Sequence, residues 1–268
     1  MPLSFREALE AQVDRVTDKW DSYLAIYDRA FAAYRDREVS LLEIGIQNGG
    51  SLEVHARYFA HHKLIIGCDI DPRCGALSFL GNDKIKVVVG DANAAETRAK
   101  IASLSADIDI IIDDGSHKSN DIIRSFLYFF PKLKPGGIFV IEDLHASYWQ
   151  NYGGGLFHPS SAMSFLKDLV DLPNREHWGL AMAPQEYLAA RHPQYAPVIG
   201  ACDLSGIHSV QFFNSVCIIE KHLTDPVASL GPRRIRGTRA DVSPGPLQMD
   251  GTRSIPPDQS NSRWSRPG

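Results

Sequence analysis

The feature that most constrains the fold is an apolar run that ends in a cluster of polar and charged residues. It reads Ile108-Asp109-Ile110-Ile111-Ile112 and continues as Asp113-Asp114-Gly115-Ser116-His117. A run this rich in β-branched residues is typical of a strand covered on both faces, as in parallel α/β sheets. Because ligands of such sheets gather beyond the carboxyl ends of the strands, Asp113, Asp114 and His117 are predicted to lie at a functional site.

The composition agrees with one folded catalytic domain. The chain has 268 residues, of which 44% are hydrophobic and 22% charged, which is enough for a full core. The net charge of −4 gives no reason to expect a nucleic-acid partner. No stretch approaches about 18 consecutive apolar residues and the start lacks the order of a secretion signal, so we expect no membrane contact and a cytoplasmic location.

The cysteines are widely spread along the chain. They are Cys68, Cys74, Cys202 and Cys217, and two of them lie inside apolar runs. We therefore expect small buried hydrophobic side chains rather than disulfides or zinc ligands.

The long run belongs to a series of alternating strand and helix patterns. Helical spacing is expected from about residue 52, over 94–103 and over 120–130, and residues 133–137 are expected to form a turn. This alternation predicts right-handed crossovers and a mostly parallel sheet of the Rossmann type. The predicted strands cover 39–45, 63–69, 85–91, 108–113 and 138–143, and a terminal antiparallel hairpin over 206–214 and 215–221 brings them to seven.

The domain organisation follows from where these patterns begin and end. Residues 1–36 are expected to form an N-terminal helical cap, and residues 37–223 the catalytic domain. The irregular stretch 144–205 is expected to be an insert that builds a substrate pocket. Residues 224–268 are rich in Pro, Gly, Arg and Ser, which predicts a disordered tail. The arginines of this tail could contact an acidic partner, but a solvated tail is favoured.

An aromatic stripe runs through the N-terminal cap. Phe5, Leu9, Val13 and Val16 share one predicted helical face, and Trp20 to Tyr34 continue the pattern. Core packing is the favoured interpretation of this stripe. The tripeptide Asp18-Lys19-Trp20 is an exception, because it interrupts the helical spacing and combines both charges with a large aromatic ring.

A glycine-rich turn follows the first predicted strand. It has the pattern Glu43-x-Gly45-x-x-x-Gly49-Gly50-Ser51 instead of the dinucleotide pattern G-x-G-x-x-G. Glycines allow backbone amides to approach a ligand, although such turns also serve as tight connections. Asp69 ends the next strand about 20 residues later, where nucleotide-binding α/β folds place a carboxylate on the ribose hydroxyls. Asp91 ends the third strand in the same way.

Three carboxylates are predicted to meet at the ends of the fourth and fifth strands. Asp114, Glu142 and Asp143 would repel one another unless a cation neutralises them. Oxygen ligands favour a hard ion such as Mg²⁺, or Mn²⁺ or Ca²⁺. His117 would lie beside that ion and is placed to act as a general base. Strand-end caps or salt bridges remain the alternative interpretation of each residue alone.

These motifs together resemble the class I methyltransferases that use S-adenosylmethionine. Within that class, the Asp113-Asp114-Gly115-Ser116-His117 motif and the Glu142-Asp143 pair are most similar to the metal-dependent macrolide-sugar O-methyltransferases. The resemblance runs from about residue 17 to residue 221. The glycine-rich turn alone would fit any class I methyltransferase.

The resemblance implies a role for each motif residue. Glu43, Gly45, Asn48, Gly49 and Ser51 would hold the methionyl part of the cofactor, Asp69 the ribose and Asp91 the adenine amino group. Asp113 is left open between cofactor contact and structural support. Asp114, Glu142 and Asp143 would bind Mg²⁺ or Mn²⁺, and His117, with Asp114 as its catalytic partner, would deprotonate the acceptor hydroxyl. Tyr148 and Trp149 are candidates for stacking on a substrate ring.

The implied function is methylation of a hydroxyl on a sugar, glycoside or related natural product, with a small-molecule or saccharide acceptor. The family is often oligomeric, which leaves a homo-oligomer open. A nucleotide-cofactor oxidoreductase would leave the cluster of Asp114, Glu142 and Asp143 unexplained. A cofactor-binding protein without catalysis is also open, although an intact base and carboxylate set argues against it.

Overall fold

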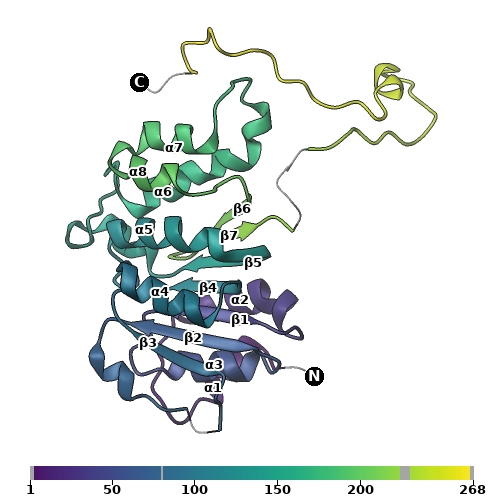
Figure 1. The fold of residues 1–268 in the computed structure, drawn as a ribbon. Coiled ribbons are helices and arrows are strands. Elements are labelled where there is room, and N and C mark those ends of the chain that lie inside the picture. Colours follow the sequence, from purple (N-terminus) through teal and green to yellow (C-terminus); the bar gives the residue numbers. More distant parts are fainter. Residues whose placement is uncertain (1–2, 80, 224–229, 266–268) are drawn as a thin grey trace.

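The computed structural model describes residues 3–79, 81–223 and 230–265. Within these residues, seven strands form one sheet in the order β3-β2-β1-β4-β5-β7-β6 (Figure 1). The first five strands pair in parallel, and β7 is antiparallel to both β5 and β6. The predicted mostly parallel sheet with a terminal antiparallel hairpin is therefore confirmed. The strands are β1 Ser40–Ile44, β2 Leu64–Asp69, β3 Ile85–Val89, β4 Ile108–Asp113, β5 Leu133–Ile141, β6 Ile207–Phe212 and β7 Cys217–Lys221.

The strand β4 lies between β1 and β5 and is buried along its whole length. Its alternate residues enter different cores, since Ile111 packs on one face of the sheet and Ile110 and Ile112 on the other. The pairing places Asp113 beside Ile44 of β1 and Ile141 of β5. The carboxyl ends of these three strands therefore lie together, as the sequence predicted.

Helices cover both faces of the sheet (Figure 1). Residues of α4, α5, α6, α7 and α8 pack into the core that contains Ile111, and residues of α1, α2 and α3 into the core that contains Ile110. This arrangement accounts for the absence of polar alternation in β4. The helices are α1 Phe5–Glu10, α2 Asp21–Phe31, α3 Gly50–Tyr58, α4 Ala95–Leu104, α5 Ser119–Phe129, α6 Ala162–Asp168, α7 Pro184–Arg191 and α8 Ala196–Gly200.

The N-terminal cap is helical only in part. The helix α1 starts with a capping box on Ser4 and Glu7 and ends at Glu10, and α2 begins only at Asp21. The prediction that Val13 and Val16 share a buried face with Phe5 is wrong, because these valines are 93% and 70% exposed. Residues 11–20 form a non-helical segment whose backbone packs against Gly50 instead. Core packing is confirmed for the α2 aromatics Tyr23, Tyr27 and Phe31.

The boundaries of β5 also differ from the prediction. The expected turn over 133–137 is part of β5, and its pairing with β4 shifts register between Ile108 and Ile110. Pro135 lies in this irregular part, where a missing backbone N–H is tolerated. The strand ends at Ile141, so Glu142 and Asp143 follow it and are free to turn toward the end of β4.

The rest of the described chain adds short elements. In the segment 144–205, α6 and α8 contact α5. Residues 230–265 hold a 3₁₀ helix, Gly245–Gln248, and the Gln259 N–H donates to the Gly179 carbonyl at 2.9 Å. Residues 224–229 and 266–268 of the predicted tail lie outside the described residues. All four cysteines lie within the described residues, and each is buried and free, as predicted.

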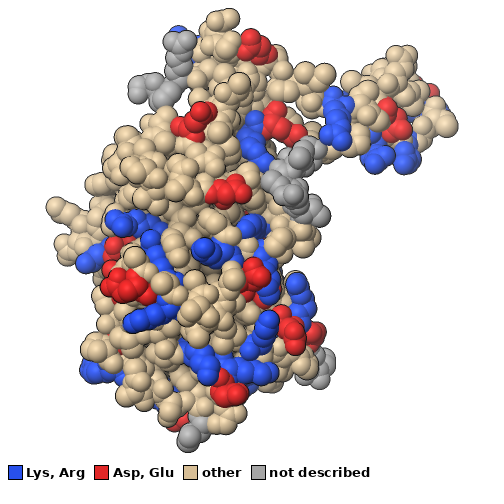
Figure 2. Space-filling view, viewed as in Figure 1, with Lys and Arg blue, Asp and Glu red and all other residues tan. Residues whose placement is uncertain are grey.

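Membrane-spanning helices and surface charge are two further features on which the sequence carried an expectation. None of the helices in the described ranges has the length and apolar character needed to span a membrane. Figure 2 shows basic and acidic side chains interspersed over the part of the surface that carries α4, β2 and β3.

Candidate active site

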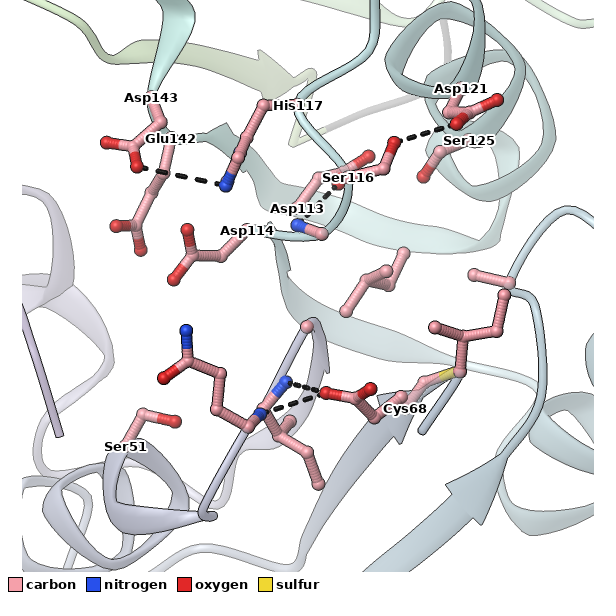
Figure 3. A pocket seen from close by; sticks show the side chains of 18 of the residues that line it. Ser51, Cys68, Asp113, Asp114, Ser116, His117, Asp121, Ser125, Glu142 and Asp143 are labelled. Atoms are coloured by element: carbon pink, nitrogen blue, oxygen red, sulfur yellow. Dashed lines mark hydrogen bonds and ion pairs between the residues drawn. The ribbon is translucent and has the colours of Figure 1, made fainter. Parts of the chain in front are cut away.

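A cavity of about 680 Å³ lies beyond the carboxyl ends of the central strands. Its wall is formed by the non-helical segment before α2 and by the turns that follow β1 to β5 (Figure 3). Most of the predicted site residues line it, namely Gly45, Ser51, Asp69, Asp91, Asp113, Asp114, His117, Glu142 and Asp143.

The glycine-rich turn after β1 packs directly against the turn after β4. Gly45 has a φ of +86°, and a Cβ there would lie 2.2 Å from the carbonyl oxygen of Asp114. Only glycine fits this position without displacing the backbone. Gly45 therefore allows the two turns to approach each other closely.

Glu43 is fully buried beneath the glycine-rich turn. Its Oε2 accepts a hydrogen bond from Ser51 Oγ at 2.7 Å and lies 3.7 Å from His55 Nε2. Its Oε1 has no hydrogen-bond partner among the described residues. Burial raises the pKa of Glu43, but His55, Lys19 and Ser51 outweigh it, so that the pKa is lowered overall. The turn thus rests on an anionic carboxylate.

Asp69, the last residue of β2, and Asp91, just after β3, bind backbone N–H groups near them. Asp69 Oδ2 accepts hydrogen bonds from the N–H groups of Ile46 and Gln47, both at 2.9 Å. Asp91 Oδ1 accepts from the Asn93 N–H at 2.8 Å. Both acids line the cavity, which agrees with their predicted position.

Asp113 is a buried acid on the floor of the cavity. It is 5% exposed, and its Oδ1 accepts a long hydrogen bond of 3.4 Å from the Gly115 N–H. Its Oδ2 is unpartnered in the described part of the chain. Burial raises the pKa of Asp113 to about 6, although the Ser125 hydroxyl and the Gly115 N–H oppose the shift.

A lysine lies among the carboxylates at the ends of β4 and β5. Lys19 Nζ is 2.5 Å from Asp114 Oδ2, 2.7 Å from Glu142 Oε1 and 3.9 Å from Glu43 Oε1. One ammonium group therefore bridges Asp114 and Glu142, a cationic partner that the sequence patterns did not indicate. Burial nevertheless raises the pKa of Asp114 to about 6 and that of Glu142 to about 7. Lys19 is thus one cation near three carboxylates, those of Asp114, Glu142 and Glu43.

Side chains of α2 and of its N-cap residue Trp20 also bind the carboxylates of this cluster. Tyr27 Oη donates a hydrogen bond to Glu142 Oε1. Tyr23 Oη donates to Asp143 Oδ1 at 2.7 Å, and the ring N–H of Trp20 donates to the same oxygen at 3.2 Å. The cap is therefore a structural part of the site.

Backbone strain is concentrated at the cavity. Within the described residues, the non-glycine residues with positive φ are Gln47, His117, Asp143 and Ser215. The first three line the cavity, and the carbonyl of Ser215 accepts a hydrogen bond from Tyr23. Strained backbone of this kind clusters at functional sites, where it aims side chains in fixed directions.

His117 faces Asp143 across the cavity (Figure 3). Its Nε2 lies 3.8 Å from Asp143 Oδ2, and its side chain is 24% exposed. Burial lowers the pKa of His117 below its usual 6.5, although Asp143 and Glu142 oppose the shift. At neutral pH the ring is therefore uncharged and can accept a proton.

The geometry is compatible with a divalent cation. Asp114, His117 and Asp143 each offer one ligand atom, and these atoms lie within 4.8 Å of one another. The raised pKa values of Asp114 and Glu142 indicate that further positive charge would stabilise the cluster. Oxygen-rich donors are suited to Mg²⁺ or Mn²⁺.

Some predicted residues lie outside the cavity wall. Asn48 is exposed, and Gly49 is the N-cap residue of α3, with a φ of +75°. Tyr148 and Trp149 are 45% and 51% exposed. Trp149 contacts His145 with ring centroids 4.9 Å apart, and His145 in turn contacts Trp20. A stacking role for Tyr148 and Trp149 stays a prediction.

The most important omission from the sequence analysis is the pairing of Lys19. The signal was the Asp18-Lys19-Trp20 interruption, but nothing in the spacing joins residue 19 to residues 114 and 142. Tyr23 and Tyr27 were predicted as core residues, and they are buried, but their hydroxyl groups also bind the site carboxylates.

Comparisons with known proteins agree with this architecture. Residues 42–144 match a family model described as a methyltransferase domain. Demethylmacrocin O-methyltransferase of Streptomyces fradiae is 37% identical over 194 residues, which cover 68% of this chain and 46% of the relative. Mycinamicin VI 2''-O-methyltransferase of Micromonospora griseorubida is 32% identical over 74% of this chain and 48% of the relative. The chain spans about half the length of the curated relatives it matches.

A solved methyltransferase structure is also similar to this chain. MycE, a methyltransferase of the mycinamycin biosynthetic pathway in complex with Mg, SAH and mycinamycin VI, has a TM-score of 0.65 and 28% identity to this chain. The similarity covers 82% of this chain and 54% of MycE.

Fold, matched region and relatives agree that the sheet around residues 42–144 resembles a methyltransferase domain of the class I type. Within this class, the chain is similar to the O-methyltransferases that modify the sugars of macrolides and tetracenomycins. The resemblance read from its motifs is thereby confirmed.

Proposed function

We propose that this protein is an S-adenosylmethionine- and Mg²⁺-dependent O-methyltransferase that acts on a hydroxyl of a sugar or glycoside. The observation that carries the proposal is the position of His117. An uncharged imidazole faces Asp114 and Asp143 in the same cavity that Gly45, Asp69 and Asp91 line. A base, a set of oxygen ligands and a cofactor-sized cleft are thus combined at one edge of the sheet.

The predicted roles fit the cavity wall. Gly45 and Ser51 line the part next to β1, where Glu43 supplies a buried negative charge for the amino end of the cofactor. Asp69 ends β2 and Asp91 follows β3, in the order expected for the ribose and the adenine. MycE, which is similar over most of this chain, was solved with SAH and Mg.

The proposed methyl transfer needs both S-adenosylmethionine and Mg²⁺. When bound, S-adenosylmethionine supplies an electrophilic sulfonium methyl group, and Mg²⁺ supplies a Lewis acid that lowers the pKa of a coordinated hydroxyl. His117 Nε2 takes the hydroxyl proton, and Asp143, 3.8 Å away, stabilises the imidazolium that forms. Asp114, Glu142 and Asp143 would hold the metal, and the cavity would orient the acceptor for in-line attack.

The acceptor is proposed to be a small glycosylated molecule. The tetracenomycin relative of Streptomyces olivaceus, a rhamnosyl 2'-O-methyltransferase, is 38% identical over 58% of this chain. Trp20 is 61% exposed and lines the cavity next to Asp143. An exposed ring beside the base can stack on a sugar face.

Methyl transfer from labelled S-adenosylmethionine to a panel of glycosides tests the proposal. His117→Ala is expected to keep cofactor binding and to lose methyl transfer by about 10²- to 10⁴-fold. Asp114→Ala is expected to lose the response to added Mg²⁺. Full turnover in EDTA would contradict the metal proposal. Tight binding of NAD, without binding of S-adenosylmethionine, would instead favour an oxidoreductase.

A further inference from the structure

The ammonium group of Lys19 occupies the position that a cation shared by two of the proposed metal ligands would take. Its Nζ lies 2.5 Å from Asp114 Oδ2 and 2.7 Å from Glu142 Oε1, and the side chain is 4% exposed. Mg²⁺ binds carboxylate oxygens at about 2.0–2.1 Å. An ion bound to both of these oxygens would overlap the ammonium group, so the two cations exclude each other there.

We propose that Lys19 is a stand-in cation, which holds Asp114 and Glu142 in place until a divalent cation replaces it. Lys19 thereby sets the metal affinity of the site, because each ion that binds must displace an ion pair already formed. This inference rests on the proposed function, since it takes Asp114 and Glu142 as metal ligands.

The backbone that carries Lys19 is held in place by contacts of the residues before and after it. Before it, Arg15 pairs with Glu53 at 3.3 Å and donates to the Ser78 carbonyl at 2.7 Å. A Cβ on Gly50 would lie 2.4 Å from the Val16 carbonyl oxygen, which shows how closely the segment packs. After it, the Trp20 ring N–H binds Asp143. Exchange therefore requires only the Lys19 side chain to move.

A second acceptor lies within reach of the displaced ammonium group. Glu43 Oε1 is 3.9 Å from Lys19 Nζ and fully buried, and it has no hydrogen-bond partner within the described ranges. A buried oxygen without a partner is costly, so a donor that moves toward it is stabilised. The flexible lysine stem allows this short shift. Lys19 would thus pass from the metal ligands to Glu43 when the ion enters.

Mn²⁺ binding to the cofactor-free protein tests the proposal, measured by the loss of the free-ion electron paramagnetic resonance signal. Lys19→Met removes the competing cation and is expected to bind Mn²⁺ at least about tenfold more tightly than the wild type, or 1.4 kcal/mol. Lys118→Met is the matched control, because it removes the same charge from the wall of the same cavity. It should tighten binding far less. Lys19→Arg keeps the charge and should not tighten it.

A stability measurement guards against a folding defect. In EDTA, Lys19→Met should melt at a lower temperature than the wild type. Mn²⁺ should raise the melting temperature of this variant by more than it raises that of the wild type. Equal or weaker Mn²⁺ binding by Lys19→Met overturns the proposal, as does a variant that stays unfolded in Mn²⁺. If neither the wild type nor any of the variants binds Mn²⁺, both the proposal for Lys19 and the proposed metal site are overturned. Methyl transfer in the same samples reports separately on the proposed activity.

Discussion

Asp113→Asn is expected to stabilise the protein at alkaline pH, although it replaces a charged residue of the candidate site. Asp113 is 5% exposed, and Oδ2 finds no hydrogen-bond partner in the described structure. Its pKa is raised to about 6 from an ordinary 3.8 because the carboxylate is buried. A shift of about two units corresponds to about 3 kcal/mol of penalty on the charged form. Removing the charge abolishes this penalty, but an amide N–H of the introduced asparagine without an acceptor would offset about 1 kcal/mol of the stabilisation.

The sign of the pH dependence follows from linkage. A carboxyl whose pKa is raised in the folded state binds its proton more tightly there, so it imposes no penalty below about pH 4 and the full penalty above about pH 6. We therefore expect Asp113→Asn to raise the free energy of unfolding by about 2 kcal/mol at pH 8. The difference should shrink toward zero or below at pH 4.5.

Urea denaturation in EDTA, followed at several pH values, measures this effect. Asp109→Asn is the matched control, since Asp109 lies on the same strand and is equally buried, but is paired. Its Oδ2 accepts from the Ser40 N–H and from Lys134 Nζ, both at 2.8 Å. Loss of that charged pair should destabilise the protein by about 1.5–3 kcal/mol. A destabilised Asp113→Asn at pH 8, or a gain independent of pH, would refute the reasoning.

Three further predictions concern the site. Gly45→Ala brings a Cβ to 2.2 Å from the Asp114 carbonyl and should cost about 2–4 kcal/mol, whereas Gly200→Ala, whose Cβ meets nothing within 4 Å, should be near neutral in the same denaturation assay. The kcat/KM of methyl transfer should fall as pH drops through the pKa of His117, which burial lowers below 6.5. Glu142, with a pKa of about 7, also titrates in this region, so a limb well above pH 7 would contradict His117 as the base. Tyr27→Phe removes the hydroxyl that binds Glu142 and should destabilise the metal-free protein by about 1.5–3 kcal/mol; unchanged thermal melting in EDTA would argue against this contact.

The sheet could be predicted from the sequence because each strand carries its own signal. The apolar run of β4 requires cover on both faces, and acids or glycines after β1 to β5 mark the edge where ligands bind. Boundaries were less accurate where tertiary contacts decide them. Val13 and Val16 continue a helical spacing, yet they are exposed because the backbone at residues 15 and 16 packs on Gly50 instead.

The site could be predicted only as far as its residues follow strands. Asp114, His117, Glu142 and Asp143 come directly after β4 or β5, so topology alone places them together. Lys19 belongs to no regular element, and its partners are 95 and 123 residues away along the chain. A contact of this kind depends on the path of an irregular segment, which local pattern and spacing do not specify.

The distribution of the site along the chain has a consequence for biosynthesis. The region that matches the methyltransferase family model covers residues 42–144, but Lys19, Tyr23 and Tyr27 precede it. The turn of the terminal hairpin follows it, and Ser215 there accepts the N–H of Leu144 at 2.9 Å and bonds to His145. A nascent chain therefore cannot complete this centre until the hairpin has left the ribosome. Fragments limited to residues 42–144 should fold incompletely and leave their carboxylates without partners.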